Sequence, residues 1–173
     1  MPVDIRRATV DDAAPIAAVL NTVIAEGNLT LFDRPFSVED ERRFIAALGP
    51  RSALHVADED GRILGVQSID LFSTAASSMS HVATMGTWLS PDSRGRGIGR
   101  QLFTESVSFA RRHDYSKIVV QILAMNARSL RFYRGLGFTD IGVAKRHVHL
   151  AGTFHDEVYL ELLLDREIRE LGN

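Results

Sequence analysis

The segment PDSRGRGIGRQLF, residues 91–103, decides how the rest of the chain is interpreted. Its glycines alternate with other residues and run into an apolar-periodic stretch, which predicts a loop that opens a helix. The first turn of a helix favours acidic residues, because the amino end carries partial positive charge. This segment has Arg94, Arg96 and Arg100 instead, and Asp92 is its only acid. An external anion would account for that arrangement.

Glycine loops between a strand and a helix commonly hold phosphate, because their backbone N–H groups can approach a ligand closely. The alternative is a tight turn whose arginines are solvated. A nucleotide-hydrolase loop is disfavoured, since it needs a lysine and a hydroxyl residue where this chain has Arg100 and Gln101. A dinucleotide-binding loop is also disfavoured, because it should follow the first strand of a parallel βαβ unit.

The composition is that of an ordinary globular chain, with 173 residues, 45% hydrophobic residues, 24% charged residues and a formal net charge of −2. We expect residues 1–173 to form a single domain, because that length is short for two. A slightly acidic balance disfavours broad nucleic-acid binding. The absence of cysteine excludes disulfides, thiolate metal ligands and a cysteine nucleophile. The charged N-terminus and the lack of a long apolar run predict a cytoplasmic protein with no membrane partner.

Hydrophobic periodicity and turn residues predict the element order β-α-α-β-β-β-α-β-α-β-β, a mixed sheet with helices packed on it. The pair Asp60 and Gly61 indicates a hairpin turn between two strands. The β-branched run at 116–125 is typical of a strand buried on both faces. The expected elements are strands at 3–9, 52–59, 62–72, 80–90, 116–125, 138–150 and 152–164, and helices at 11–27, 37–50, 97–113 and 127–135.

A second motif, NARSLRFYRGLGF at residues 126–138, follows the glycine loop. Residues 94–99 resemble the R/Q-x-x-G-x-G/A loop of the GCN5-related N-acetyltransferase (GNAT) family, and residues 126–138 resemble its N-x-x-(A/S)-x-x-x-Y-x-x-x-G-F signature. The resemblance spans nearly the entire chain. Residues 81–99 and 152–162 further resemble the phosphinothricin-type branch, whose members acetylate small molecules.

This resemblance implies the GNAT fold, an α/β (α+β) domain whose mixed, mostly antiparallel sheet has about seven strands and about four flanking helices. The sheet is expected to splay between its fourth and fifth strands. The resemblance also implies acetyl-CoA as the acyl donor, no metal, and the pyrophosphate of coenzyme A as the anion that the arginines need. The implied cofactor-binding residues are Thr87, Trp88, Leu89, Arg94, Gly95, Arg96, Gly97, Ile98, Gly99, Arg100, Asn126, Ser129 and Tyr133.

The family signature implies that Tyr133 is the general acid that protonates the leaving thiol. Its alternative role is packing, one helical turn from Leu130. The resemblance assigns main-chain contacts to Thr87 and Leu89, with an N–H group as oxyanion donor, and leaves Trp88 as packing or substrate wall. Asn126 could bind pantetheine, cap the following helix, or do both.

The general base is the weakest part of the assignment, because phosphinothricin-type relatives have a glutamate at the position of Thr84. Glu26 and His81 are candidates for a base or an amine-binding group, and the pair His155 and Asp156 is a further candidate. Ordered water could equally relay the proton.

The segment EGNLTLFDRPF, residues 26–36, is expected to form the acceptor wall. Leu29, Phe32 and Phe36 give it apolar character, and His155 is a further candidate for substrate binding. His147 and His149 are spaced to share one strand face, but no carboxylate or cysteine completes a metal site.

We therefore expect an acetyl-CoA-dependent N-acetyltransferase that acts on a primary amine of a small molecule or peptide, by direct attack in a ternary complex. The alternative is a non-catalytic acyl-CoA-binding or sensor module in which Thr84 marks a lost base. An RNA-binding module built on RGRG suits neither the net charge nor the lack of aromatic signatures near the loop. A homodimer through the late strands is possible, and the sequence does not identify the acceptor.

Overall fold

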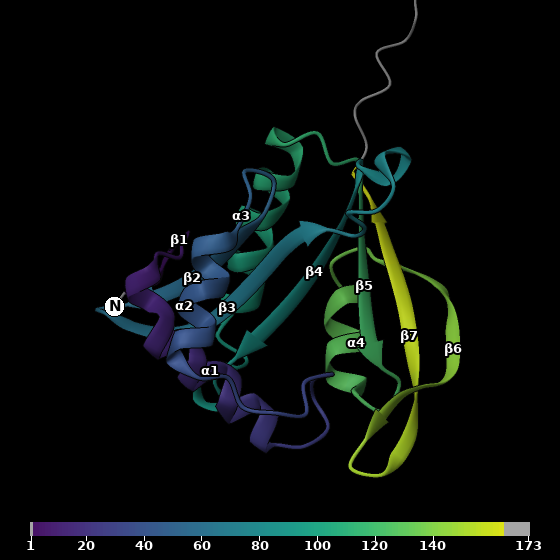
Figure 1. Cartoon of the computed structure of the whole chain (residues 1–173), viewed down its shortest axis with the longest axis horizontal. Coiled ribbons are helices and arrows are strands. Elements are labelled where there is room, and N and C mark those ends of the chain that lie inside the picture. Colours follow the sequence, from purple (N-terminus) through teal and green to yellow (C-terminus); the bar gives the residue numbers. More distant parts are fainter. Residues whose placement is uncertain (1, 165–173) are drawn as a thin grey trace, which may run out of the picture.

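The structure, a computed structural model, describes residues 2–164 and is organised around one seven-stranded sheet in the order β1-β2-β3-β4-β5-β7-β6 (Figure 1). Only β4 and β5 run parallel, and the other neighbouring pairs are antiparallel. The strands are β1 (Asp4–Arg7), β2 (Ala53–Glu59), β3 (Arg62–Leu71), β4 (Val82–Leu89), β5 (Lys117–Leu123), β6 (Thr139–Leu150) and β7 (Thr153–Leu163).

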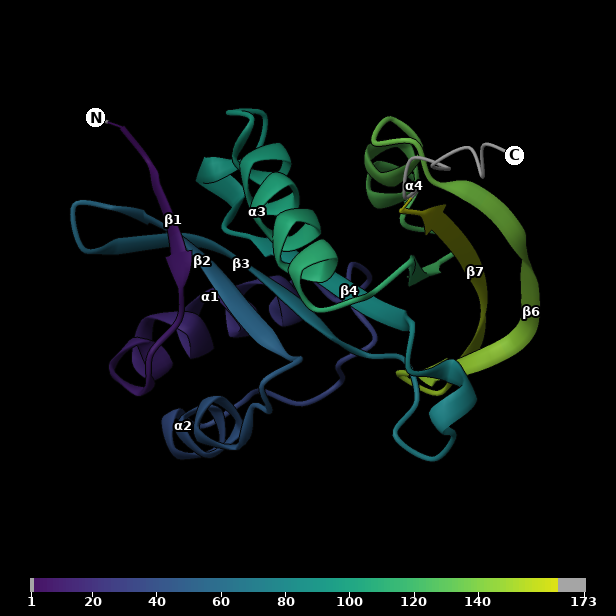
Figure 2. The same cartoon turned by 90° about the horizontal axis from the view of Figure 1, so that it is seen from above.

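Helices cover both faces of the sheet. In Figure 2, α1 and α2 lie on one face and α3 and α4 on the other. No helix within residues 2–164 is long and apolar enough to cross a membrane. The helices are α1 (Ala13–Ala25), α2 (Val38–Ala47), α3 (Ile98–Arg112) and α4 (Ala127–Arg134), with 3₁₀ turns η1 (Val10–Asp12), η2 (Ser77–Met79) and η3 (Pro91–Ser93). The predicted element order and the mixed sheet are confirmed.

Apolar side chains on the two faces form separate cores. On the α1 side, Ile16 packs with Val56 and Val66, all fully buried. On the other side, Ile118 and Leu160 belong to a core beneath α3 and α4. Because β5 contributes buried residues to both faces, its run of β-branched residues has no polar alternation.

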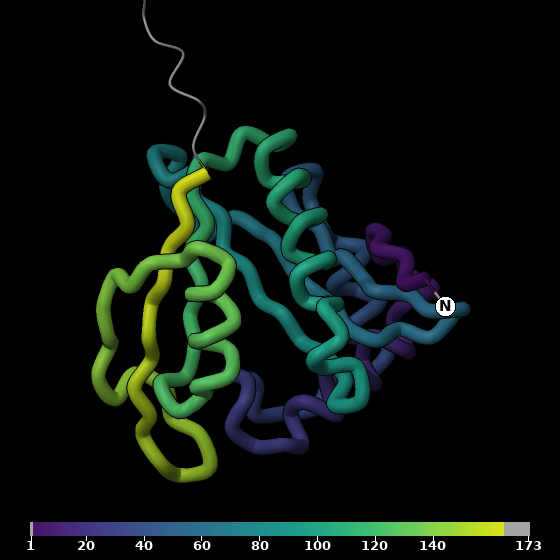
Figure 3. The backbone as a smooth tube through the Cα atoms, turned by 180° about the vertical axis from the view of Figure 1, so that it is seen from behind, coloured from purple at the N-terminus to yellow at the C-terminus, as the bar shows by residue number. Residues whose placement is uncertain are grey.

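The sheet opens between β4 and β5, as predicted. Their parallel pairing covers only Val82 to Thr84 of β4, opposite Lys117 to Val119 of β5. Beyond Thr84, β4 stays paired with β3, and β5 stays paired with β7. The two halves of the sheet therefore diverge toward the start of α4, and Figure 3 shows α3 and α4 on either side of the opening.

Two turns depend on backbone conformations that glycine favours. Asp60 and Gly61, at φ of 53° and 83°, form the predicted hairpin turn between β2 and β3. Gly95 and Gly97, both at φ of 79°, bend the chain between η3 and α3. Gly97 is the N-cap residue of α3, so the predicted glycine loop does open a helix.

Candidate active site

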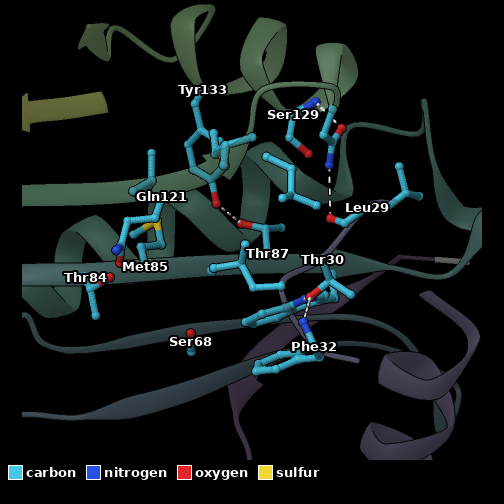
Figure 4. A pocket seen from close by; sticks show the side chains of 17 residues that line it. Leu29, Thr30, Phe32, Ser68, Thr84, Met85, Thr87, Gln121, Ser129 and Tyr133 are labelled. Atoms are coloured by element: carbon cyan, nitrogen blue, oxygen red, sulfur yellow. Dashed lines mark hydrogen bonds between the residues drawn. The ribbon is translucent and has the colours of Figure 1, made fainter. Parts of the chain in front are cut away.

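Two adjoining cavities occupy the opening between β4 and β5. The glycine-loop cavity, of about 310 Å³, is lined by the end of β4, the loop residues Arg94, Gly95 and Gly97, and the first turns of α3 and α4. The splay cavity, of about 190 Å³, is lined by residues 29–32, the middles of β3, β4 and β5, and α4 (Figure 4). The two cavities share a wall that consists of Leu29, Thr87, Trp88, Asn126, Ser129 and Tyr133.

Backbone groups of β4 face this opening. The amide of Ser90 donates to the Leu64 carbonyl and the amide of Phe72 to the Val82 carbonyl, each at 3.0 Å. Hydrogen-bonded pairs alternate along an antiparallel ladder, so even-numbered residues of β4 direct their backbone groups toward β3. Thr87, which is odd-numbered and lies beyond the last pair with β5, directs its N–H and C=O groups into the opening.

The first turn of α3 presents backbone donors to the glycine-loop cavity. Ile98 and Gly99 line this cavity, and their N–H groups lack an intrahelical acceptor, as at the start of any α-helix. Apart from the glycine itself and its two chain neighbours, no described residue has an atom within 4 Å of the place that a Cβ would take at Gly95 or Gly97. The loop therefore leaves an open cradle, with partial positive charge at the helix end.

The charges near this cradle differ from the prediction. The Arg94 guanidinium lines the cavity, but it forms a two-bond ion pair with Glu26 and also donates to the Leu89 carbonyl at 3.1 Å. Arg96 pairs with Glu59 and does not line the cavity. The Arg96 side chain thus has a carboxylate partner on β2, and its assignment to the cofactor stays a prediction.

Two other arginines are better placed for an external anion. Arg100 lines the glycine-loop cavity, and no carboxylate within residues 2–164 forms an ion pair with it. Arg128, in the first turn of α4, also lines this cavity and acts electrostatically on Glu26. Sequence reasoning missed Arg128, although α4, like α3, has no acid in its first turn.

Asn126 links residues 26–36, the expected acceptor wall that we call the acceptor loop, to α4. Its Oδ1 accepts from the Ser129 amide at 3.1 Å, which makes it the predicted helix cap, and its Nδ2 donates to the Leu29 carbonyl at 3.0 Å (Figure 4). Asn126 is 5% exposed. Both ends of its amide thus already have a structural partner, and a contact with pantetheine would use its second N–H or the second lone pair of Oδ1.

Tyr133 lies at the junction of the two cavities and is 4% exposed. Its hydroxyl is 2.7 Å from Thr87 Oγ1 (Figure 4). Gln67 Nε2 donates to the same oxygen at 2.7 Å. Burial raises the pKa of Tyr133 to about 12, and the hydrogen bond from Thr87 opposes that shift. Gln67 is a residue that sequence reasoning missed, because it lies on β3, far from either motif.

The acceptor loop folds over the splay cavity. Trp88 Nε1 donates to Thr30 Oγ1 at 3.2 Å, and the Phe32 ring stacks on Trp88 at a centroid distance of 5.6 Å. Leu29 and Phe32 line the cavity, as predicted. Phe36 packs edge-on against Phe32 at 4.9 Å and lies outside the lining, so it supports the wall from behind.

The candidate bases do not gather at this site. Glu26 lies outside both linings, and its hydrogen bonds with Arg94 lower its pKa, which makes it a poor base. His81 is exposed, precedes β4 and lies outside both linings, as does His155. Asp156 instead binds Lys145 Nζ at 2.9 Å. Thr84 does line the splay cavity.

The histidines of β6 do not form a metal site. His147 lies 3.7 Å from Glu157, whereas His149 packs against Phe154, and these two β7 residues point to opposite faces. The shared face that the spacing predicted is lost because β6 bulges around Arg146. Among the described residues, no group of three or more His, Cys, Asp or Glu side chains could hold a metal ion.

Comparison with known proteins gives one consistent result. The family model described as Acetyltransferase (GNAT) family matches residues 22–138. A phosphinothricin N-acetyltransferase of Streptomyces coelicolor is 23% identical over 92% of this chain and 95% of its own length. An L-methionine sulfoximine/L-methionine sulfone acetyltransferase of Salmonella typhimurium is 25% identical over 93% of this chain and 94% of its own length.

A solved structure shares the fold. The phosphinothricin acetyltransferase of Sinorhizobium meliloti, in complex with AcCoA, has a TM-score of 0.86 at 23% identity and covers 95% of this chain and 89% of its own. The fold is thus that of this solved acetyltransferase, and the family model covers both the glycine loop and the Tyr133 signature. The chain belongs to the GNAT acetyltransferase family and is an acyltransferase.

Proposed function

We propose that this protein transfers the acetyl group of acetyl-CoA to a primary amine, by direct attack while both substrates are bound. One observation carries the proposal: the opening between β4 and β5 joins a cavity with a cationic helix end to a second cavity, and Tyr133 belongs to both linings. Dimerisation through the late strands, a cytoplasmic location and the single-domain organisation of residues 1–173 stay predictions.

The glycine-loop cavity fits the diphosphate of the acyl donor. The N–H groups of Ile98 and Gly99 would bind its oxygens, and Arg100 and Arg128 supply positive charge at the same cavity. The fit rests on the empty space at Gly97 and on two helix amino ends, neither of which has an acid in its first turn.

The exposed backbone of β4 fits the rest of the donor. The Thr87 N–H and C=O groups can pair with the amides of pantetheine, because they have no strand partner on the β5 side. An N–H group of this strand would also donate to the thioester oxygen, on which negative charge develops in the transition state. Such donors act without rearrangement, since β3 holds β4 in place.

Tyr133 is suited to donate a hydrogen bond to the leaving sulfur. Because Thr87 Oγ1 accepts a hydrogen bond from Gln67, the Thr87 hydroxyl can donate its own hydrogen bond to the Tyr133 oxygen. The Tyr133 proton is then free to point into the opening. Gln67 and Thr87 would thus act as positioning residues for Tyr133.

The proposed acetyl transfer forms one bond and breaks one bond. The amine nitrogen attacks the thioester carbon, the C–N bond forms, and the C–S bond breaks with the electron pair leaving on sulfur. Tyr133 stabilises that sulfur by a hydrogen bond until it takes up a proton. Neither cavity is lined by a carboxylate or an imidazole within residues 2–164, so water takes the proton that the amine loses.

The decisive experiment combines titration calorimetry with a thiol-release assay over a panel of amines. Uptake of acetyl-CoA together with amine-dependent release of free thiol supports the proposal. Uptake without release for any amine supports the alternative, an acyl-CoA-binding or sensor module, for which the absence of a glutamate at Thr84 is the specific observation. A folded protein that takes up no acetyl-CoA overturns both functions.

A further inference from the structure

We infer that the acceptor is a small primary amine with an apolar or aromatic skeleton and no carboxylate, so that an amine is accepted where the corresponding amino acid is rejected. This inference rests on the proposed function and names its substrate class. The observation behind it is that no charged side chain lines the splay cavity within residues 2–164.

A carboxylate bound in such a cavity would have no cation to pair with. Removing an ionised carboxylate from water without a counterion is strongly unfavourable, since neutral hydrogen bonds replace its hydration only in part. The polar groups of the cavity wall are hydroxyls and amides, including Ser68, Thr84 and Gln121. They can bind a neutral amine, but they cannot neutralise an anion.

The arginines that line the adjoining cavity and the lysine of β5 do not line the splay cavity. Arg94, Arg100 and Arg128 line the glycine-loop cavity and not the splay cavity, and Arg94 already pairs with Glu26. On β5, Lys117 pairs with Glu161. The charge of the site therefore lies at the donor end, and the acceptor end is neutral.

The shape of the cavity suits a flat apolar group. Phe32 and Trp88 stack with an interplanar angle of 24° and form one side of the space (Figure 4). Its volume of about 190 Å³ exceeds the roughly 150 Å³ of an apolar cavity that accepts benzene. A single ring with a short aminoalkyl chain therefore fits, and an aromatic ring gains dispersion contact with these side chains.

Uncharged groups are available to orient the amine. Gln121 Nε2 donates to the Tyr159 hydroxyl at 3.1 Å, which holds the amide and leaves its carbonyl oxygen free to accept from an amine N–H. Figure 4 shows the Gln121 amide beside Thr84 at one end of the cavity. An amine bound there would present its lone pair toward the Thr87 and Tyr133 side of the space.

The test uses three acceptors that differ at one position: 2-phenylethylamine, phenylalaninamide and phenylalanine. Thiol release is measured at matched concentrations of the neutral amine, so that differences in amine pKa drop out. We expect kcat/KM for phenylalanine to be at least about 100-fold below that for 2-phenylethylamine. Phenylalaninamide should lie within about tenfold of 2-phenylethylamine, because its added group is neutral.

Two variants separate charge from fit. Thr84→Arg adds a cation to the cavity wall and should narrow the gap between phenylalanine and 2-phenylethylamine by about tenfold or more. Phe32→Ala should raise KM for 2-phenylethylamine, while calorimetry shows unchanged acetyl-CoA affinity, because Phe32 does not line the glycine-loop cavity.

Several outcomes would overturn the inference. Turnover of phenylalanine, phosphinothricin, methionine sulfoximine or a polyamine at or above the efficiency of 2-phenylethylamine shows that the cavity accepts further charge. In that case the transferase proposal survives, because thiol is released. If acetyl-CoA binds and no amine in the wider panel releases thiol, the transferase proposal and this inference fail together.

Discussion

Replacing Tyr133 by phenylalanine tests how the leaving thiol is stabilised. The substitution removes one hydroxyl from a side chain that is 4% exposed and keeps the ring packing with Phe132 and Phe138. Thr87 Oγ1 loses its contact with that hydroxyl but keeps the hydrogen bond from Gln67. The Thr87 hydroxyl loses the oxygen to which it donates but lines both cavities, so the unfolding free energy of the variant is measured beside its kcat.

The magnitude follows from the pKa of Tyr133, which burial raises to about 12. A thiol has a pKa of about 8.5, so complete proton transfer from Tyr133 to the thiolate is uphill by roughly 3.5 units, or about 5 kcal/mol. Tyr133 should therefore keep its proton and contribute a hydrogen bond to a charged acceptor. Such a bond contributes about 1.5–3 kcal/mol, which predicts a fall in kcat of about 10- to 150-fold.

The assay is thiol release with saturating amine and acetyl-CoA, followed from pH 6 to pH 10. We expect the same pH profile in wild type and Tyr133→Phe, because a phenol with a pKa of about 12 does not ionise in that range. Titration calorimetry should show acetyl-CoA affinity within about threefold of wild type. The loss should thus lie in kcat alone.

Tyr115→Phe is the matched control. Tyr115 is 3% exposed, donates one hydrogen bond of 2.8 Å to the Arg51 carbonyl, and lies outside both cavities. Both variants should lose about 0.5–1.5 kcal/mol of unfolding free energy, and Tyr115→Phe should keep full kcat. If Tyr133→Phe keeps its kcat within twofold, the assigned role is wrong. A fall beyond about 10⁴-fold with an altered basic limb would show instead that the proton is transferred.

Three further predictions use matched positions. Gly97 and Gly152 have φ of +79° and +78° with open space around them, so leucine at either position should lower the unfolding free energy by about 1–2 kcal/mol. Only Gly97→Leu should weaken acetyl-CoA binding in calorimetry. Equal acetyl-CoA affinities in the two variants would contradict the proposed phosphate cradle. Glu26→Gln should raise acetyl-CoA affinity about two- to fivefold, because it frees Arg94, which lines the glycine-loop cavity. Glu59→Gln should leave the affinity unchanged, because its partner Arg96 lies outside that cavity. A lower affinity in Glu26→Gln would refute the idea that Glu26 competes with the donor for Arg94. Burial lowers the pKa of His55 to about 4, so protonation opposes folding as the pH falls below the ordinary histidine pKa of ~6.5. The free energy of unfolding, measured in urea, should therefore fall by about 2 kcal/mol between pH 7.5 and pH 5 in wild type but not in His55→Gln. An identical pH dependence in both proteins would exclude His55 as the cause.

The fold could be predicted because its determinants are local. The hairpin turn at Asp60 and Gly61 needs positive φ at both residues, and the glycine loop needs it at Gly95 and Gly97. The opening of the sheet came from the family resemblance alone, because a strand that loses one neighbour halfway along its length has no distinct residue pattern. The bulge near Arg146 was missed because residues 144–147 have no β-branched side chain that would mark a change of strand face.

The cavities of the candidate site could be anticipated where the backbone forms them, but not where side chains pair over long distances in the chain. Gly97 and Gly99 line the cavity through their backbone, so their position does not depend on which side chains pair nearby. The pairing of Arg94 with Glu26 joins residues that are 68 apart in the chain, and the pairing of Arg96 with Glu59 joins residues that are 37 apart. Sequence periodicity carries no information on such contacts, so it could not predict that Arg94 and Arg96 each pair with a carboxylate of this chain.

The missing base can be understood from the division of charge between the two cavities. The donor end has two helix amino ends and the arginines Arg100 and Arg128. Within residues 2–164, the side chains that line the splay cavity are hydroxyls, amides and apolar groups. A low-polarity environment lowers the pKa of an ammonium group, because burial penalises the charged form. An acceptor that enters this cavity therefore gives up its proton to water more readily than it does in solution. If the proposed function holds, Thr84 is compatible with activity. The uncharged cavity would favour the neutral form of the acceptor amine, and in relatives with a glutamate at this position a carboxylate would instead take the proton.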